Sequence, residues 1–162
     1  MNHAFLLIGG NLGRRAENLE TAISLIHQMA GEVVQQSGIY QTAAWGNTHQ
    51  PDFLNQALEI ATGLEPAPLL AILLAIEAKM GRIRQEKYGA RIIDIDILLF
   101  NEVIMDTENL TIPHPRLPER RFVLVPLAEI AGSLMHPTVH LTIAQLLQNC
   151  SDSLNVQKFY GE

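Results

Sequence analysis

The clearest strand in the sequence is Arg91-Ile92-Ile93-Asp94-Ile95-Asp96-Ile97-Leu98-Leu99-Phe100, which predicts one β-strand over residues 92–100. Successive side chains of a strand face opposite sides, so Asp94 and Asp96 are expected to share one side. The other side would carry Ile93, Ile95, Ile97 and Leu99, and we expect that side to be the core. The strand therefore predicts a sheet with one apolar face and one face that presents two carboxylates.

The segments before this strand follow the same kind of patterning. Apolar runs or alternation predict strands at 4–8, 32–40 and 53–62, and helical spacing or an early proline predicts helices at 16–29 and 65–80. A glycine turn at 9–13 and a loop at 42–52 separate them. The resulting order is βαββαβ, which predicts an α+β, ferredoxin-like fold with an antiparallel sheet. Two helices would pack on one face, leaving the other face free for a site.

The segments after the strand are expected to be additions to this core. Asn101-Glu102 predicts a turn into a short return strand, and residues 111–121 are expected to be irregular and exposed. Helices are predicted at 122–130, despite Pro126, and at 141–149, with a weakly patterned tail. With 162 residues, of which 48% are hydrophobic, the chain suits one domain spanning 1–162.

Charge and cysteine content narrow the function class. A net charge of −6 argues against nucleic acid as a partner. Six of the eight arginines nevertheless lie between Arg82 and Arg121, which favours a small polyanionic ligand or, equally, a solvated basic face. The single Cys150 favours a reducing compartment. No run reaches the ~18–20 apolar residues of a membrane helix, so we expect a cytoplasmic protein without membrane contact.

The aspartate pair is the strongest candidate for chemistry. Asp94 and Asp96 would lie ~6–7 Å apart along the strand, and they repel each other unless a cation lies between them. Mg²⁺ typically takes one or two carboxylates and completes its shell with water and substrate phosphates. Taken alone, the pair also fits the polar face of an ordinary strand. The neighbouring arginines, whose forks match phosphate oxygens, favour a nucleotide triphosphate and its metal.

The stretch Lys87-Tyr88-Gly89-Ala90-Arg91-Ile92-Ile93-Asp94-Ile95-Asp96-Ile97-Leu98 resembles the signature of the 6-hydroxymethyl-7,8-dihydropterin pyrophosphokinases, a family of folate biosynthesis. Further segments resemble the same family in order and spacing, across nearly the whole chain: Ile8–Gly13, Tyr40–Thr42, Gln50–Asn55, Glu77–Arg84 and Ile112–Phe122. The resemblance implies an ATP-dependent diphosphotransferase that gives AMP and the pterin diphosphate.

The resemblance also implies roles for single residues. Asp94 and Asp96 would bind two magnesium ions, and Arg82 and Arg91 would contact the phosphates. The ATP site would be lined by Glu77, Arg84, Ile97, Thr111, His114 and Arg120. The pterin would be held by Thr42, Phe53, Asn55 and Phe122, with the main chain near Trp45. A flat pterin suits stacking between aromatic rings, and its polar edge suits an amide.

Two other functions stay open at this point. The paired aspartates also suit a magnesium-dependent nucleotidyltransferase, which would release pyrophosphate in place of AMP. A ferredoxin-like sheet also suits a non-enzymatic ligand-binding module, because the fold alone does not define function. We expect a monomer whose partners are ATP and 6-hydroxymethyl-7,8-dihydropterin.

Overall fold

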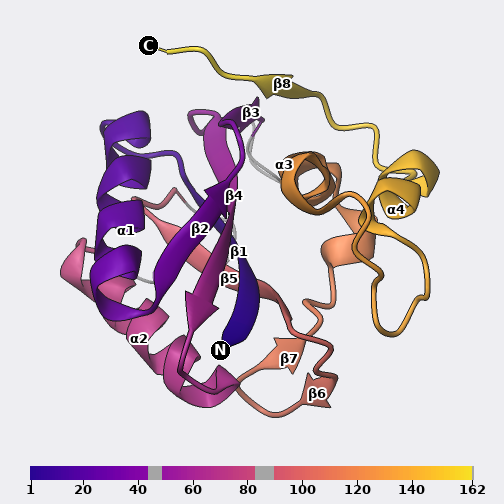
Figure 1. The fold of residues 1–162 in the computed structure, drawn as a ribbon. Coiled ribbons are helices and arrows are strands. Elements are labelled where there is room, and N and C mark those ends of the chain that lie inside the picture. Colours follow the sequence, from indigo (N-terminus) through magenta and orange to yellow (C-terminus); the bar gives the residue numbers. More distant parts are fainter. Residues whose placement is uncertain (44–48, 83–89, 162) are drawn as a thin grey trace.

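The computed structural model describes residues 1–43, 49–82 and 90–161, which form a sheet with helices on both faces (Figure 1). The elements follow one another as β1 (Asn2–Gly10), α1 (Arg15–Met29), β2 (Glu32–Gln36), β3 (Tyr40–Thr42), β4 (Phe53–Thr62), α2 (Pro66–Lys79), β5 (Asp94–Phe100), β6 (Met105–Asp106), β7 (Thr111–Ile112), the 3₁₀ turn η1 (Leu117–Glu119), α3 (Arg121–Ala131), α4 (Ile143–Asn149) and β8 (Val156–Lys158). The described helices include none that is long and apolar enough to cross a membrane.

The main sheet has six antiparallel strands. Its order is β5-β1-β4-β3-β8, and β2 pairs with β4 next to β3. The predicted antiparallel sheet and the βαββαβ core order are therefore confirmed. The long strand β4 pairs with β1 over residues 54–62, while its other edge pairs with β3 near Asn55 and with β2 near Ile60. β1 and β4 thus form the centre from which the site strands extend.

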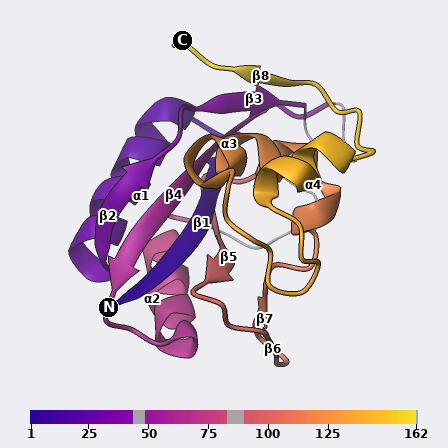
Figure 2. The same ribbon diagram turned by 45° about the vertical axis from the view of Figure 1, so that its right-hand side comes forward.

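Two apolar layers hold the helices to the sheet. On one face, Leu6 and Ile8 of β1 pack with buried side chains of α1 and α2, such as Ile26 and Leu73. On the other face, Leu7 packs with α3 and α4. Figure 2 shows α3 and α4 lying over one end of that second face. The expectation of a free second face is thus wrong in part, because the C-terminal additions bury apolar side chains there.

The alternation predicted for β5 holds as far as Leu98. Phe5 pairs with Leu99, whereas the next residue, Leu6, pairs with Ile97, so a β-bulge leaves Leu98 without a direct partner in β1. A bulge places two residues opposite one and shifts the side-chain alternation. Leu99 therefore joins the α3–α4 layer, and the prediction that it shares the face of Ile97 is wrong.

Other differences have local causes. The strand predicted over 32–40 is interrupted, because the Ser37 hydroxyl accepts a hydrogen bond from the Ala57 N–H at 2.9 Å, in place of a backbone carbonyl. The predicted return strand, β6, pairs with β7 and not with β5. Residues 111–121 are not uniformly exposed, because Ile112 and Leu117 are buried in the two apolar layers. The tail contains β8, which is too short to give a periodic pattern.

Candidate active site

A pocket opens on the second face of the sheet, beside the part that α3 covers. It is lined by Leu7, Gly9, Thr42, Ala43, Phe53, Asn55, Arg91, Asp94, Asp96, Arg120 and Phe122. Eight of these eleven residues were predicted as site residues, and Leu7, Gly9 and Ala43 were not. The space it encloses is about 100 Å³. Whole small-molecule pockets are typically ~300–1,000 Å³, so this space suits part of a ligand, such as a flat ring.

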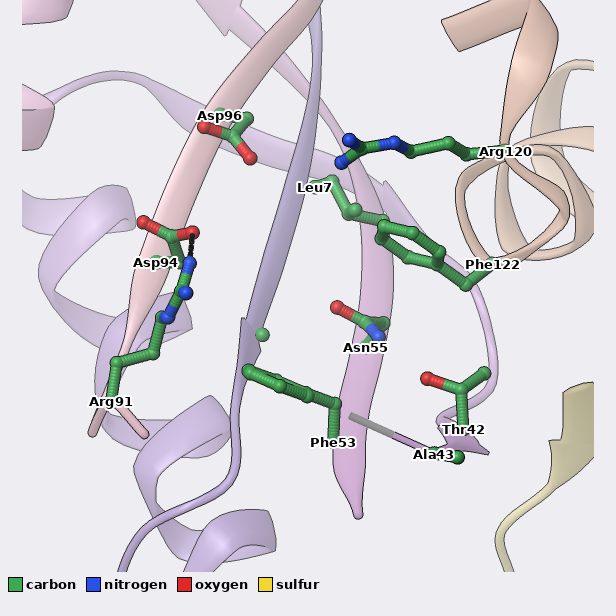
Figure 3. A pocket seen from close by; sticks show the side chains of 11 residues that line it. Leu7, Thr42, Ala43, Phe53, Asn55, Arg91, Asp94, Asp96, Arg120 and Phe122 are labelled. Carbon is green, nitrogen blue, oxygen red and sulfur yellow. Dashed lines mark hydrogen bonds and ion pairs between the residues drawn. The ribbon is translucent and has the colours of Figure 1, made fainter. Parts of the chain in front are cut away.

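The two aspartates reach the pocket from β5. Asp96 pairs with Leu7 and Asp94 pairs with Gly9, both on β1. Figure 3 shows the two carboxylates on the same side of the strand, as the alternation predicted. Because Gly9 has no side chain, the Asn55 amide can approach β1 beside Asp94, with its Oδ1 close to where a Cβ of residue 9 would lie. The fold therefore presents both carboxylates to one space that a ligand can enter.

Two arginines contact the first aspartate. Arg91 donates from Nη1 to Asp94 Oδ2 at 2.9 Å, and Arg82 Nη2 lies 3.4 Å from Asp94 Oδ1. The Arg91 guanidinium also lies over the Phe53 ring, 5.4 Å from its centroid. Arginine forks bind phosphate oxygens in the same geometry as carboxylates. The guanidinium groups of Arg82 and Arg91 are thus placed to bind anionic groups next to Asp94.

The electrostatics of Asp96 indicate a site that needs a cation. Burial, followed by the charges of Asp94 and Glu77, raises the pKa of Asp96 from 3.8 to about 7, although Arg91 and Arg82 act in the opposite direction. Three carboxylates therefore face two guanidinium groups. In the described part of the chain no three His, Cys, Asp or Glu side chains form a metal-binding group. Two carboxylates without further protein ligands suit Mg²⁺, which retains water and binds phosphates, better than zinc.

Glu77 lies behind the aspartate strand and does not line the pocket. Its side chain is 3% exposed, and its Oε2 accepts a hydrogen bond of 2.7 Å from the Ile95 N–H, between the two aspartates. Its Oε1 lies 3.5 Å from Arg82 Nε, a buried donor that makes no hydrogen bond among the described residues. Glu77 thus holds both β5 and Arg82 in place.

The remaining residues assigned to the ATP site surround the aspartates at different depths. Burial and the charges of Arg120 and Arg116 lower the pKa of His114 below 6.5, while the charge of Asp94 raises it. The His114 ring therefore interacts electrostatically with Asp94. Ile97 is buried in the α1–α2 layer, so only its main chain could meet a ligand. Thr111 donates to Asp106 across the β6–β7 pair at 2.9 Å. Arg84 and Trp45 lie outside the described residues.

The other end of the pocket is aromatic. Phe53 comes from β4, whereas Phe122 comes from the start of α3, and the Asn55 amide lies between them in Figure 3. Thr42, at the end of β3, and Asn55 are buried, with 4% and 5% exposure. Arg120 Cζ lies 5.7 Å from the centre of the Phe122 ring and extends toward Asp96. Two rings and an amide suit a flat heterocycle with a polar edge.

Asn11 joins the segments around the pocket, a role that the sequence did not reveal. It is 1% exposed, and its Nδ2 donates to Gln50 Oε1 and to the Pro51 carbonyl at 2.9 and 3.0 Å. Its Oδ1 accepts from the Arg91 N–H at 2.8 Å. The only sequence signal was an asparagine inside the glycine turn 9–13. That turn thus connects Arg91 to the segment before Phe53.

Gly9→Ala should weaken binding of the flat ligand. A methyl group at this position would coincide with Asn55 Oδ1 and press on the Leu54 carbonyl, so the Asn55 amide would have to turn away. We expect the KM for the heterocyclic substrate to rise about tenfold or more, the usual effect of a lost buried hydrogen bond. Steady-state kinetics would measure it. Gly63→Ala is the matched control, because nothing lies within 4 Å of its added methyl; equal KM values for both variants would contradict the prediction.

Comparison with known proteins gives one consistent result. A family model described as 7,8-dihydro-6-hydroxymethylpterin-pyrophosphokinase (HPPK) matches residues 5–132. A 2-amino-4-hydroxy-6-hydroxymethyldihydropteridine pyrophosphokinase of Bacillus subtilis is 47% identical over 130 residues, covering 80% of this chain and 78% of its own length. A protein of the same name from Methylorubrum extorquens is 43% identical over 149 residues, covering 90% and 94%.

Solved structures share the fold. The wild-type HPPK-DHPS of Plasmodium falciparum with pterin and p-hydroxybenzoate superposes with a TM-score of 0.74 at 20% identity. The match covers 91% of this chain and 42% of that longer one. At this identity the likeness concerns the fold alone.

Proposed function

This chain belongs to the 7,8-dihydro-6-hydroxymethylpterin-pyrophosphokinase family, and we propose that the pocket between β5 and α3 is its active site. The chain is an enzyme of folate biosynthesis that transfers a diphosphate group from ATP to 6-hydroxymethyl-7,8-dihydropterin. The observation that carries the site is the arrangement of one aspartate pair, two arginines (Arg91 and Arg120) and two aromatic rings around a single space.

Asp94 and Asp96 hold magnesium in this proposal. Their shared face, and the charge imbalance that raises the pKa of Asp96, both favour a divalent cation. With two carboxylates and the phosphates of ATP as ligands, the site accommodates two ions. When bound, Mg²⁺ neutralises phosphate charge and acidifies the attacking hydroxyl. The cytoplasmic location, the monomeric state and the absence of nucleic acid from its partners remain part of the same proposal.

The arginines bind and orient the phosphates. Arg82 and Arg91 already lie against Asp94, and Arg120 extends toward Asp96 from α3. The hydroxymethyl oxygen attacks the β-phosphorus of ATP, the bond from that phosphorus to the oxygen bridging the α-phosphate breaks, and AMP leaves. Spread negative charge in the transition state is stabilised by fixed cations more than the ground state is. Arg84, Ile97, Thr111 and His114 complete the ATP side, and Glu77 supports it from behind β5 through Arg82 and the Ile95 N–H.

The pterin lies at the aromatic end of the pocket. Phe53 and Phe122 stack on its faces, and Asn55 and Thr42 meet its polar edge, with the main chain near Trp45 alongside. Support comes from the pocket lining and from the burial of Thr42 and Asn55. In this proposal the hydroxymethyl group points toward the aspartates, because the rings and the carboxylates line one space.

Product analysis tests the function. The protein is incubated with ATP, Mg²⁺ and 6-hydroxymethyl-7,8-dihydropterin, and nucleotides are separated by chromatography. We expect one AMP per pterin diphosphate formed. Release of pyrophosphate would instead identify a nucleotidyltransferase, and binding without any turnover would identify a ligand-binding module.

Phe122→Ala should raise the KM for the pterin. The ring lines the pocket at the first turn of α3, and loss of one stacking partner costs about 1–2 kcal/mol, or roughly tenfold in affinity. Initial rates at varied pterin and at varied ATP separate the two substrates. Phe122→Tyr keeps the ring and serves as control. A KM for the pterin that is the same in Phe122→Ala and Phe122→Tyr would contradict the stacking role.

Stability without metal should fall at neutral pH because of Asp96. The pKa of Asp96 is raised from 3.8 to about 7 in the folded state, so the folded protein binds this proton more tightly than the unfolded chain does. The resulting stabilisation is fully present below pH 4 and is lost as the pH rises through 7. At pH 8 in EDTA, Asp96→Asn should therefore unfold at a higher temperature than the natural protein, by roughly 5 °C, and the difference should vanish near pH 4. Calorimetry measures it. Glu20→Gln, at an exposed position, is the control; a pH-independent difference would contradict the prediction.

A further inference from the structure

The last residues of the chain contact both walls of the aromatic end of the pocket. Residues 152–159, which we call the C-terminal strap, run past the start of α3 and then along β3 (Figures 1 and 2). β8 pairs antiparallel with β3, with Val156 opposite Thr42, and the Phe159 N–H donates to the Ile39 carbonyl at 2.8 Å. The strap lies beyond residues 5–132, which match the family model. It therefore adds a connection that the matched region does not contain.

Asp152 caps α3 from a distance of 31 residues along the chain. The residue before the helix, Arg120, makes no capping hydrogen bond with its own side chain. Asp152 Oδ2 instead accepts from the Arg121 N–H at 3.0 Å, and its Oδ1 accepts from the Leu154 N–H at 3.0 Å. A carboxylate at the start of a helix accepts a hydrogen bond from a backbone N–H that has no partner within the helix, and it interacts favourably with the positive end of the helix dipole. The capped turn carries Phe122.

A second contact joins the same helix to β3. Glu129 of α3 accepts from the Gly38 N–H at 2.9 Å and from the Tyr40 hydroxyl at 2.5 Å, and Lys158 Nζ of β8 lies 3.9 Å away. Burial alone would raise the pKa of Glu129, but the bonds from Tyr40 and Gly38 and the charge of Lys158 lower it. Glu129 is thus ionised at neutral pH. α3, β3 and β8 form one connected unit.

The unit of α3, β3 and β8 carries residues on two sides of the proposed pterin pocket. β3 ends at Thr42, and α3 begins beside Phe122, so the distance between these walls depends on how α3 sits against β3. The strap contacts both elements at the ends nearest the pocket: Asp152 holds the start of α3, and Val156 pairs with Thr42. We infer that the C-terminal strap, through the positioning residue Asp152, fixes the Phe122 wall against the Thr42 wall and thereby determines affinity for the pterin. The inference rests on the proposed pterin site.

Asp152→Ala tests the inference through the KM values of the two substrates. We expect the KM for the pterin to rise about tenfold, the scale of a lost helix cap expressed as affinity, and the KM for ATP to change at least threefold less. Ser153→Ala, at the exposed neighbouring position, should match the natural protein. Asp152→Asn keeps one of the two acceptor functions and should fall between. A KM for the pterin unchanged in Asp152→Ala, with only the unfolding temperature lowered, would overturn the inference.

A second variant acts on the strap from its other end. Hydrogen-bonded and non-bonded pairs alternate in antiparallel strands, so the Phe159–Ile39 bond implies that the Gln157 N–H faces Gln41. Gln157→Pro removes this donor without touching α3, and it should raise the KM for the pterin in the same way. An effect on ATP alone would overturn the inference. If the natural protein and Ser153→Ala form no AMP, the proposed function fails. If both form AMP and Asp152→Ala and Gln157→Pro bind pterin normally, only the strap inference fails.

Discussion

Asp96→Asn is expected to lower kcat on the order of a thousandfold or more, because it removes one of the two carboxylates that we propose to hold magnesium. The fold should persist, since the amide keeps the shape of the side chain and relieves the repulsion from Asp94 and Glu77. AMP formation at saturating substrates measures the rate, and calorimetry measures the fold. Turnover within tenfold of the natural enzyme would rule out the metal role.

A comparison of Asp94→Asn with Asp96→Asn separates cation binding from the positioning of the arginines. Asp94 contacts Arg82 and Arg91 at 3.4 and 2.9 Å, so its neutralisation weakens two ion pairs as well as the cation site. We expect a similar loss of kcat, but with lower stability in place of higher. Opposite shifts in unfolding temperature with the same loss of rate would separate cation binding from the positioning of the arginines. Glu20→Gln, on the exposed face of α1, should change neither.

Glu77→Ala is expected to be the most destabilising single change near the site. It leaves the Ile95 N–H without its acceptor and Arg82 without one carboxylate partner, in a region where Glu77 is 3% exposed. Breaking a buried ion pair by removing one member typically costs about 3–5 kcal/mol. For a chain of this size that corresponds to a fall of ~10 °C in Tm. Urea unfolding monitored by circular dichroism gives the free energy directly.

Glu77→Gln separates the two contributions of that side chain. Its amide oxygen can still accept from the Ile95 N–H, whereas the charge facing Arg82 is gone, so the loss of stability should be clearly smaller than for alanine. If Glu77 acted only as a ligand of ATP, Glu77→Ala would raise the KM for ATP and leave the unfolding free energy unchanged.

Much of the fold follows from patterns of single segments. β4 has the predicted bounds, and α1 and α2 begin and end within about one residue of the predicted helices. These segments are long, and each has a local cue: apolar spacing in α1, partial alternation in β4 and an early proline in α2. The bulge at Leu98 and the interruption at Ser37 were not predictable, because each depends on the partner strand. β8 was missed because three residues show no period.

The candidate site likewise has features that the sequence predicted and features that it could not predict. The carboxylate face could be predicted, since alternation within one strand decides it. The positions of Asn11 and Glu77 could not, because each side chain bonds to backbone groups of another segment. The resemblance to a family named residues on both sides of the pocket. It did not distinguish a lining residue such as Asn55 from a supporting one such as Glu77, a difference that only burial and hydrogen bonding define.

The bulge in β5 also protects the enzyme against misassembly. A strand that slipped by one residue against β1 would turn Asp94 and Asp96 toward the largely apolar layer of α1 and α2, which also contains the buried carboxylate of Glu77, and would send isoleucines into the pocket. With Leu98 left out of the pairing, Leu99 and Phe100 face opposite apolar layers. No uniform slip satisfies both halves of the strand. The unpaired Leu98 thus favours a single register for the strand that carries Asp94 and Asp96.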